Sequence, residues 1–111
     1  MDERLKQRFD RETASAPVVI YMKGSPEMPQ CGFSRNAVLA FRELGVPVAH
    51  VNVLEDPEAW SGIKEYTDWP TIPQIFVGGR FLGGSSIVLE CLESGELKRL
   101  VDEAQGAGVP A

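Results

Sequence analysis

Residues 18–45 read VVIYMKGSPEMPQCGFSRNAVLAFRELG, and the rest of the chain is organised around this stretch. It begins with an apolar run at 18–22, which is typical of a buried β-strand. It ends with apolar residues at the spacing of one helical face, namely Ala37, Ala40, Phe41 and Leu44. Gly45 and Pro47 then stop the helix. A strand and a helix are therefore expected, with Cys31-Gly32-Phe33-Ser34 at their junction.

Cys31 is expected at the N-terminus of this helix. Unpaired N–H groups and the positive end of the helix dipole favour a thiolate there. The pKa of a cysteine in such a place falls from about 8.5 to roughly 3.5–7.5. Lys23, at the other end of a loop that contains Pro26 and Pro29, adds a positive charge. This pattern predicts a reactive or metal-binding sulfur rather than a merely buried cysteine.

Composition indicates a single domain, predicted over residues 1–105, with a flexible tail at 106–111. The chain has 111 residues, 43% of them hydrophobic and 24% charged, as in ordinary globular domains. Its net charge of −5 argues against a nucleic-acid partner. No apolar stretch reaches the roughly 20 residues that span a bilayer. The acidic start, Met1-Asp2-Glu3-Arg4, is unlike a signal or transit peptide, so a soluble cytoplasmic protein with no membrane partner is expected.

The two cysteines, Cys31 and Cys91, do not form a disulfide framework. A single bridge between them is one interpretation, and two free thiols in a reducing compartment are the other, favoured one. Cys91 lies among leucine and valine residues and is expected to fill core space, with a redox role as the alternative. One histidine and two distant cysteines cannot supply four metal ligands, so any metal needs ligands from outside the chain.

The remaining elements follow from periodicity and from turn residues. They are a helix at 2–14, at the edge of the core, a strand at 48–53, a helix at 56–66, strands at 74–77 and 80–83 around Gly78-Gly79, and helices at 87–94 and after Gly95. Two strands joined by a helix pair in parallel through a right-handed crossover. The order predicts an α/β thioredoxin-like fold, a four-stranded mixed sheet flanked by helices, with an extra N-terminal helix.

Four motifs, at these spacings, resemble those of the monothiol glutaredoxins of the Cys-Gly-Phe-Ser class. The matching stretches are Met22-Lys23-Gly24, Pro29-Gln30-Cys31-Gly32-Phe33-Ser34, Trp69-Pro70-Thr71-Ile72-Pro73-Gln74 and Gly83-Gly84. The resemblance runs from about Ser15 to Val101 and implies the glutaredoxin fold. It also implies that the protein binds glutathione and a [2Fe–2S] cluster, for cluster storage, transfer and redox homeostasis. Two subunits and two glutathiones would share the cluster, with BolA-like proteins and apo iron–sulfur clients as partners.

The resemblance also implies roles for individual residues. Cys31 would be the redox-active cysteine and the iron ligand. Lys23 would contact a carboxylate of glutathione, and the backbone of Ile72, before a cis Pro73, would pair with its cysteine. The γ-glutamyl end would lie at a helix start that contains Gly84, Ser85 and Ser86. The site would also contain an aromatic residue, Phe33, and a second lysine, Lys64. Lysines and helix N-termini are suitable receptors for an anionic peptide.

Two positions depart from the family pattern. Trp60 stands where relatives usually have arginine, which removes a contact to the glycine carboxylate, and Lys64 is a candidate to replace it. Ser85-Ser86 stands where relatives usually have Cys-Asp, so Ser86 offers the γ-glutamyl amine a hydroxyl but no charge. Trp69 fits a core position and a partner-facing position equally well.

Three functions remain open. The first is an iron–sulfur carrier. The second is a glutathione-dependent monothiol oxidoreductase, in which the Cys31 thiolate takes the glutathionyl group from a mixed disulfide and free glutathione resolves it. The third is an adaptor for a BolA-like partner. Ser34 in place of a second cysteine excludes a dithiol route, and the class is generally poor at the monothiol reaction, which favours the carrier.

Overall fold

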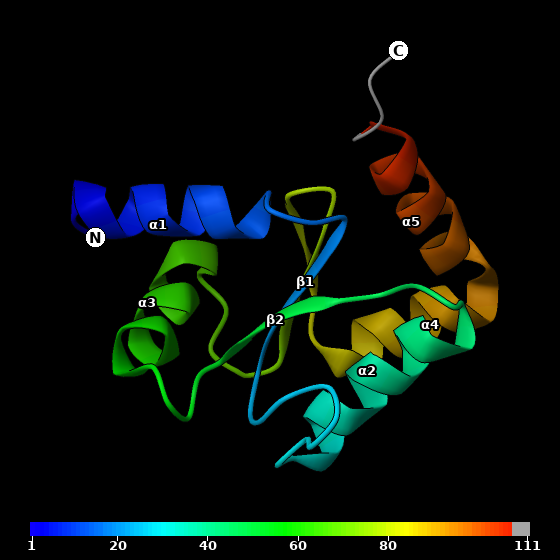
Figure 1. The fold of residues 1–111 in the computed structure, drawn as a ribbon, viewed down its shortest axis with the longest axis horizontal. Coiled ribbons are helices and arrows are strands. Elements are labelled where there is room, and N and C mark those ends of the chain that lie inside the picture. The colour runs from blue at the N-terminus through cyan, green and yellow to red at the C-terminus, as the bar shows by residue number, and fades with distance from the viewer. Residues whose placement is uncertain (108–111) are drawn as a thin grey trace.

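A computed structural model describes residues 1–107. Its elements are α1 (Glu3–Thr13), β1 (Val18–Met22), α2 (Gly32–Glu43), β2 (Ala49–Asn52), α3 (Pro57–Thr67), β3 (Gln74–Val77), β4 (Arg80–Gly83), α4 (Ser85–Ser94) and α5 (Glu96–Ala107). The sheet order is β2-β1-β3-β4, with β1 parallel to β2 and the other pairs antiparallel. Figure 1 shows α1 and α3 on one side of the sheet and α2, α4 and α5 on the other. The predicted mixed sheet and N-terminal helix are confirmed.

β1 is an inner strand of the sheet and is buried on both faces. All five of its residues are at most 2% exposed. Val18, Ile20 and Met22 pack in the core with α2, α4 and α5, while Val19 and Tyr21 pack under α1 and α3. Burial from both sides explains why the strand is an unbroken apolar run rather than an alternating one.

α1 is mostly exposed along its length, but it inserts one ring more deeply into the core than its thin apolar pattern predicts. Asp2 caps it as predicted, because its carboxylate accepts the Leu5 backbone N–H at 2.8 Å. Phe9, however, is fully buried, and its ring centroid lies 5.8 Å from that of Tyr21 and 5.4 Å from that of Tyr66. One apolar pair along a helix is too weak a pattern to show how deeply a ring inserts.

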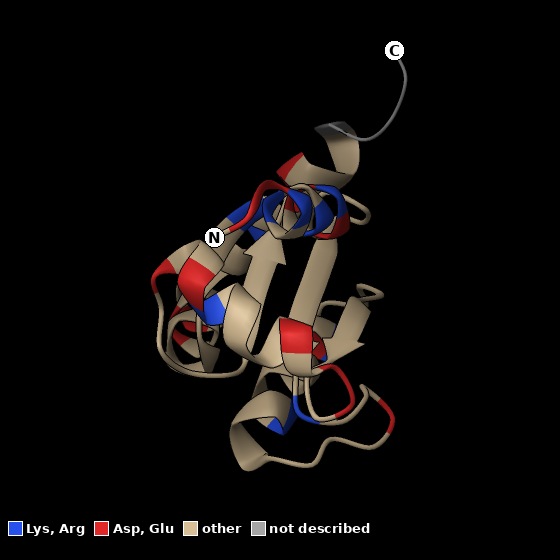
Figure 2. Cartoon of the chain, turned by 90° about the vertical axis from the view of Figure 1, so that its left-hand side faces the viewer, with Lys and Arg blue, Asp and Glu red and all other residues tan. Residues whose placement is uncertain are grey.

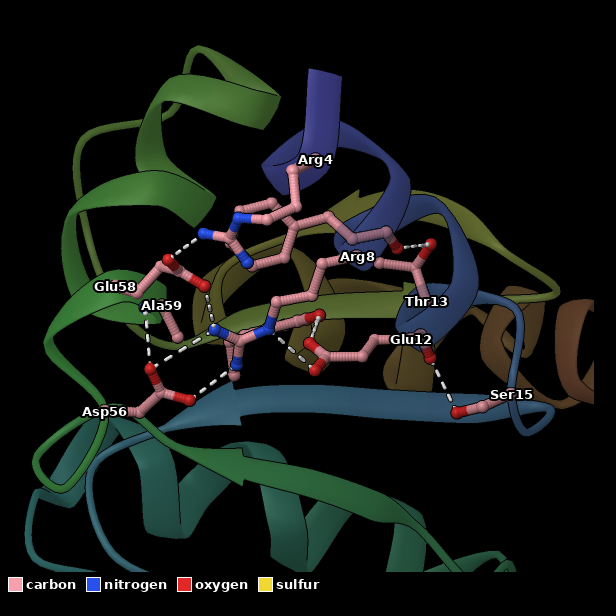
Figure 3. A network of polar contacts seen from close by, with 10 residues as sticks. Arg4, Arg8, Glu12, Thr13, Ser15, Asp56, Glu58 and Ala59 are labelled. Carbon is pink, nitrogen blue, oxygen red and sulfur yellow. Dashed lines mark hydrogen bonds and ion pairs between the residues drawn. The ribbon is translucent and has the colours of Figure 1, made fainter. Parts of the chain in front are cut away.

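Arg8 ties α1 to the start of α3 (Figure 3). Its guanidinium pairs with the carboxylate of Asp56, with Glu58 at 2.9 Å and with Glu12 at 2.9 Å. The Arg8 side chain is only 17% exposed. Asp56 also caps α3, accepting the Ala59 N–H at 3.0 Å. Figure 2 shows basic and acidic residues close together on α1, the helix that supplies this network.

Replacing Arg8 by methionine is expected to lower the free energy of unfolding by about 1–2 kcal/mol at neutral pH, between the values of surface and buried pairs. Arg8 lowers the pKa of Asp56, so this stabilisation is present above the unfolded-state pKa of about 3.9 and is lost as pH falls through the folded-state value. Urea denaturation should therefore show the two proteins converging in stability below about pH 4.

The control for this experiment is Arg11→Met, because Arg11 is an exposed arginine of the same helix that forms no ion pair within residues 1–107. It should change stability by less than about 0.5 kcal/mol. If Arg8→Met lowers the free energy of unfolding by the same amount from pH 7 to pH 3, packing of the side chain, not the ion pair, causes the loss.

Two helix boundaries differ from the prediction by two residues or more. α4 begins at Ser85, two residues early, with Gly84 as its N-cap, because serines suit the first turn of a helix as well as a loop. α5 continues through Gly106 and Ala107, where the tail was expected to start. Adding a turn to an existing helix costs little even at a glycine. The rest of that predicted tail, 108–111, lies outside the described residues. Across residues 1–107, every helix is too short or too polar to cross a membrane.

Candidate functional site

A cavity of about 500 Å³ opens beside Cys31. Five parts of the chain meet around it: the end of β1, the start of α2, one side of α3, the segment before β3 and the start of α4. The structure brings together all nine residues that the sequence nominated: Lys23, Cys31, Phe33, Lys64, Ile72, Pro73, Gly84, Ser85 and Ser86. Four more residues line the cavity without a nominated role there: Trp60, Trp69, Pro70 and Thr71.

Cys31 is the N-cap residue of α2, as predicted. Its side chain makes no capping hydrogen bond. The backbone N–H of Ser34 first, and then that of Phe33, nevertheless lower the pKa of the Cys31 thiol, with help from the charge of Lys23. Partial burial opposes this shift. The thiolate is therefore favoured mainly by the first turn of α2.

Ser34 joins the two ends of the loop between β1 and α2. It is fully buried, and its hydroxyl accepts the backbone N–H of Lys23 at 3.2 Å. The Gln30 N–H donates to the Lys23 carbonyl at 2.8 Å, which closes the loop from the other side. Gly24 has a φ of +90°, and a Cβ there would lie 2.4 Å from the Met28 carbonyl oxygen. The loop is thereby held in one conformation that keeps Lys23 and Cys31 on the same cavity.

Trp60 contacts both lysines of the cavity. The Nζ of Lys64 is 4.0 Å from the centroid of the Trp60 ring, and the Nζ of Lys23 is 5.5 Å from it. Ammonium groups are attracted to the face of an indole at these distances. The structure thus places Lys64 where the sequence proposed it, in the cavity with Lys23, and adds that an aromatic ring holds both.

Gln74 is a positioning residue to which the sequence assigned no role. It is fully buried, and its amide donates to the carbonyl oxygens of Trp69 at 2.9 Å and Thr71 at 3.3 Å. Its side-chain oxygen accepts the Thr67 hydroxyl at 2.8 Å. The signal in the sequence was an amide side chain directly after Pro73. In the structure the peptide bond before Pro73 is cis. Gln74 shapes the cavity wall formed by residues 69–73.

Trp69 forms an exposed part of that wall rather than part of the core. It is 38% exposed, and its ring meets Phe81 edge-on at 5.7 Å. Of the two positions that the sequence left open, the structure therefore favours the outward one.

Cys91 is a free thiol, as is Cys31, so the structure has no bridge between them. It is partly buried on α4 against the core that α2 and α5 share, as expected for a residue that fills space. Burial, followed by the charges of Glu96 and Glu90, raises the pKa of its thiol. The pKa values of the two thiols are thus shifted in opposite directions.

This difference predicts the order of alkylation. Thiolate is the reactive form, so iodoacetamide should modify Cys31 at lower pH and faster than Cys91 in the folded protein. Intact mass measured against time at pH 7 should show one adduct before the second, and peptide mapping should place it on Cys31. In Cys31→Ser the fast phase should disappear. Equal rates at the two cysteines would contradict the assigned environments.

The glutaredoxin family model matches residues 18–82, from β1 through the hairpin of β3 and β4. The chain belongs to the glutaredoxin family. An uncharacterised monothiol glutaredoxin, ycf64-like, from Synechocystis is 45% identical over 104 residues, which are 94% of this chain and 97% of the relative. Glutaredoxin 4 of Buchnera aphidicola is 46% identical over 95 residues, or 86% and 88% of the two chains.

The solved structure of reduced poplar apo GrxS14 is similar to this monothiol glutaredoxin, with a TM-score of 0.80 and 42% identity, covering 91% of this chain and 93% of that one. The resemblance seen in the motifs is therefore confirmed for the fold and for the monothiol glutaredoxin family.

Proposed function

We propose that this monothiol glutaredoxin binds glutathione in the cavity beside Cys31 and carries a [2Fe–2S] cluster between two copies of the chain. Its roles would be cluster storage, transfer to apo client proteins with a BolA-like partner, and redox homeostasis. The observation that carries the proposal is the meeting of one thiol of lowered pKa with two lysines in a single cavity.

The cavity suits glutathione in size and chemistry. Its volume of about 500 Å³ lies in the range of small-molecule sites. Lys23 and Lys64 offer charge to carboxylates, and the start of α4 offers unpaired backbone N–H groups. Ile72 is nearly buried, at 8% exposure, and lies in a non-helical segment whose backbone can bond an extended peptide.

The cluster is cargo that a single chain has too few ligands to hold. Within residues 1–107 no group of three or more His, Cys, Asp or Glu side chains is placed to bind a metal ion. Iron–sulfur clusters are normally held by four thiolates. Two copies of Cys31 and two glutathione thiols supply four. Phe33, two residues after Cys31 and 65% exposed, offers apolar surface where the second copy would approach.

Anaerobic reconstitution tests the proposal. The protein with iron, sulfide and glutathione is expected to become red-brown and to elute with the mass of two chains. Omitting glutathione should leave it colourless and monomeric, because two of the four sulfur ligands are then absent. A colourless monomer in the presence of glutathione would overturn the carrier proposal.

The lowered pKa of Cys31 also favours a second candidate, a monothiol oxidoreductase. The Cys31 thiolate would attack the glutathione sulfur of a mixed disulfide, forming a Cys31–glutathione disulfide and releasing the client thiolate. A glutathione thiolate would then attack the same glutathione sulfur, releasing oxidised glutathione and restoring the Cys31 thiolate. Turnover of a glutathionylated peptide would favour this candidate, and its absence would favour the carrier.

A further inference from the structure

Apart from the Cys31 thiolate, the charged groups that line the cavity are positive. Its charged lining residues are Lys23 and Lys64, and no aspartate or glutamate lines it. This is unexpected in a chain with 16 acidic and 11 basic residues. Within residues 1–107 neither lysine forms an ion pair with a carboxylate. Both ammonium groups are therefore available to an anionic ligand.

The Trp60 ring lies near both ammonium groups. The Nζ atoms of Lys64 and Lys23 lie 4.0 and 5.5 Å from the same ring centroid, so both positive charges are at the Trp60 end of the cavity. A carboxylate at this end of the cavity is attracted by both charges. This end of the cavity is suited to one full negative charge.

The start of α4 makes a second positive region in the same cavity. Gly84 is the N-cap and provides no side-chain acceptor, and the first turn contains no acidic residue. The backbone N–H groups of Ser85 and Ser86 thus have no side-chain partner in the described structure, and α4 is ten residues long. The Ser86 hydroxyl is exposed and uncharged. A carboxylate is stabilised in this position, whereas an ammonium group is not.

We propose that the cavity binds thiols with a carboxylate at each end and no ammonium group at the α4 end, and binds them at least as tightly as glutathione. This inference rests on the proposed function, in that it takes the ligand to be a thiol of glutathione's length. Glutathione carries an ammonium beside its γ-glutamyl carboxylate. Bound with its γ-glutamyl end at α4, glutathione would bring that group to a helix N-terminus and a serine hydroxyl, with no acidic group to receive it, so the ammonium would contribute no affinity.

The test compares two ligands that differ only in the ammonium group: S-methyl glutathione and S-methyl glutaryl-cysteinyl-glycine. Trp60 and Trp69 line the cavity, so tryptophan fluorescence and calorimetry both report binding. The glutaryl ligand should bind the unmodified protein with equal or lower Kd. Ser86→Asp should reverse this and favour glutathione by about tenfold or more, since it adds a charge-assisted hydrogen bond. Ser86→Asn, of the same size but uncharged, should keep the original ratio.

The outcomes separate this inference from the proposed function. If glutathione binds the unmodified protein about tenfold tighter than the glutaryl ligand, the inference is wrong and the glutathione site stands. If neither ligand binds, both are wrong. If Ser86→Asp gains no preference for glutathione over Ser86→Asn, the ammonium does not lie at α4 and the inference fails.

Discussion

Cys31→Ser is expected to abolish the cluster entirely. After anaerobic reconstitution with iron, sulfide and glutathione, the visible absorbance of the variant should stay at the level of a metal-free sample, and its mass should stay that of one chain. The physical reason is the ligand count, since Cys31 is the thiol of the cavity and iron–sulfur clusters require thiolates. Glutathione thiols alone leave two of four positions without a sulfur.

The matched control is Cys91→Ser. The same change of sulfur to oxygen then falls on a partly buried thiol that does not line the cavity. This variant should keep both the colour and the dimer, with at most a modest loss of stability. Retention of colour in Cys31→Ser would overturn the assignment of Cys31 as the iron ligand. Loss of colour in a folded Cys91→Ser protein would do so as well.

Phe9→Ala is expected to lower the free energy of unfolding by about 3–5 kcal/mol. That is a large part of the roughly 5–15 kcal/mol that stabilises a typical domain. The ring is fully buried against Tyr21 and Tyr66. On α3, the ring faces Gly62, where a Cβ would lie 2.9 Å from it. α1 and α3 therefore pack closely at this point, and their contact depends on the Phe9 ring. Urea denaturation followed by circular dichroism measures the change.

Phe33→Ala removes the same atoms from an exposed position and is the control. Its side chain is 65% exposed in the first turn of α2, so stability should change by less than about 0.5 kcal/mol. A similar loss in the two variants would mean that burial of Phe9 does not explain its effect. A loss below about 1 kcal/mol in Phe9→Ala would mean that α1 is not part of the core.

Local signals were sufficient for most of the elements. The bounds of β1, β3 and β4 agree with the prediction to the residue, because an apolar run and a Gly78-Gly79 turn are readable from neighbours along the chain. The cap at Asp2 and the start of α3 after Asp56 were readable for the same reason. The start of α4 was not, because Ser85 and Ser86 are compatible with a loop and with a first helical turn.

The sequence by itself determined most of the secondary structure and the family, and it nominated residues that line the cavity, since each motif is short and can be recognised from neighbouring residues. Only the tertiary structure decided the depth of Phe9, the pairing of Arg8 with Asp56, and the meeting of Lys23 and Lys64 on the Trp60 ring. These contacts join residues that are distant along the chain, and their energies depend on burial and on distances that arise only when the sheet and its helices pack together.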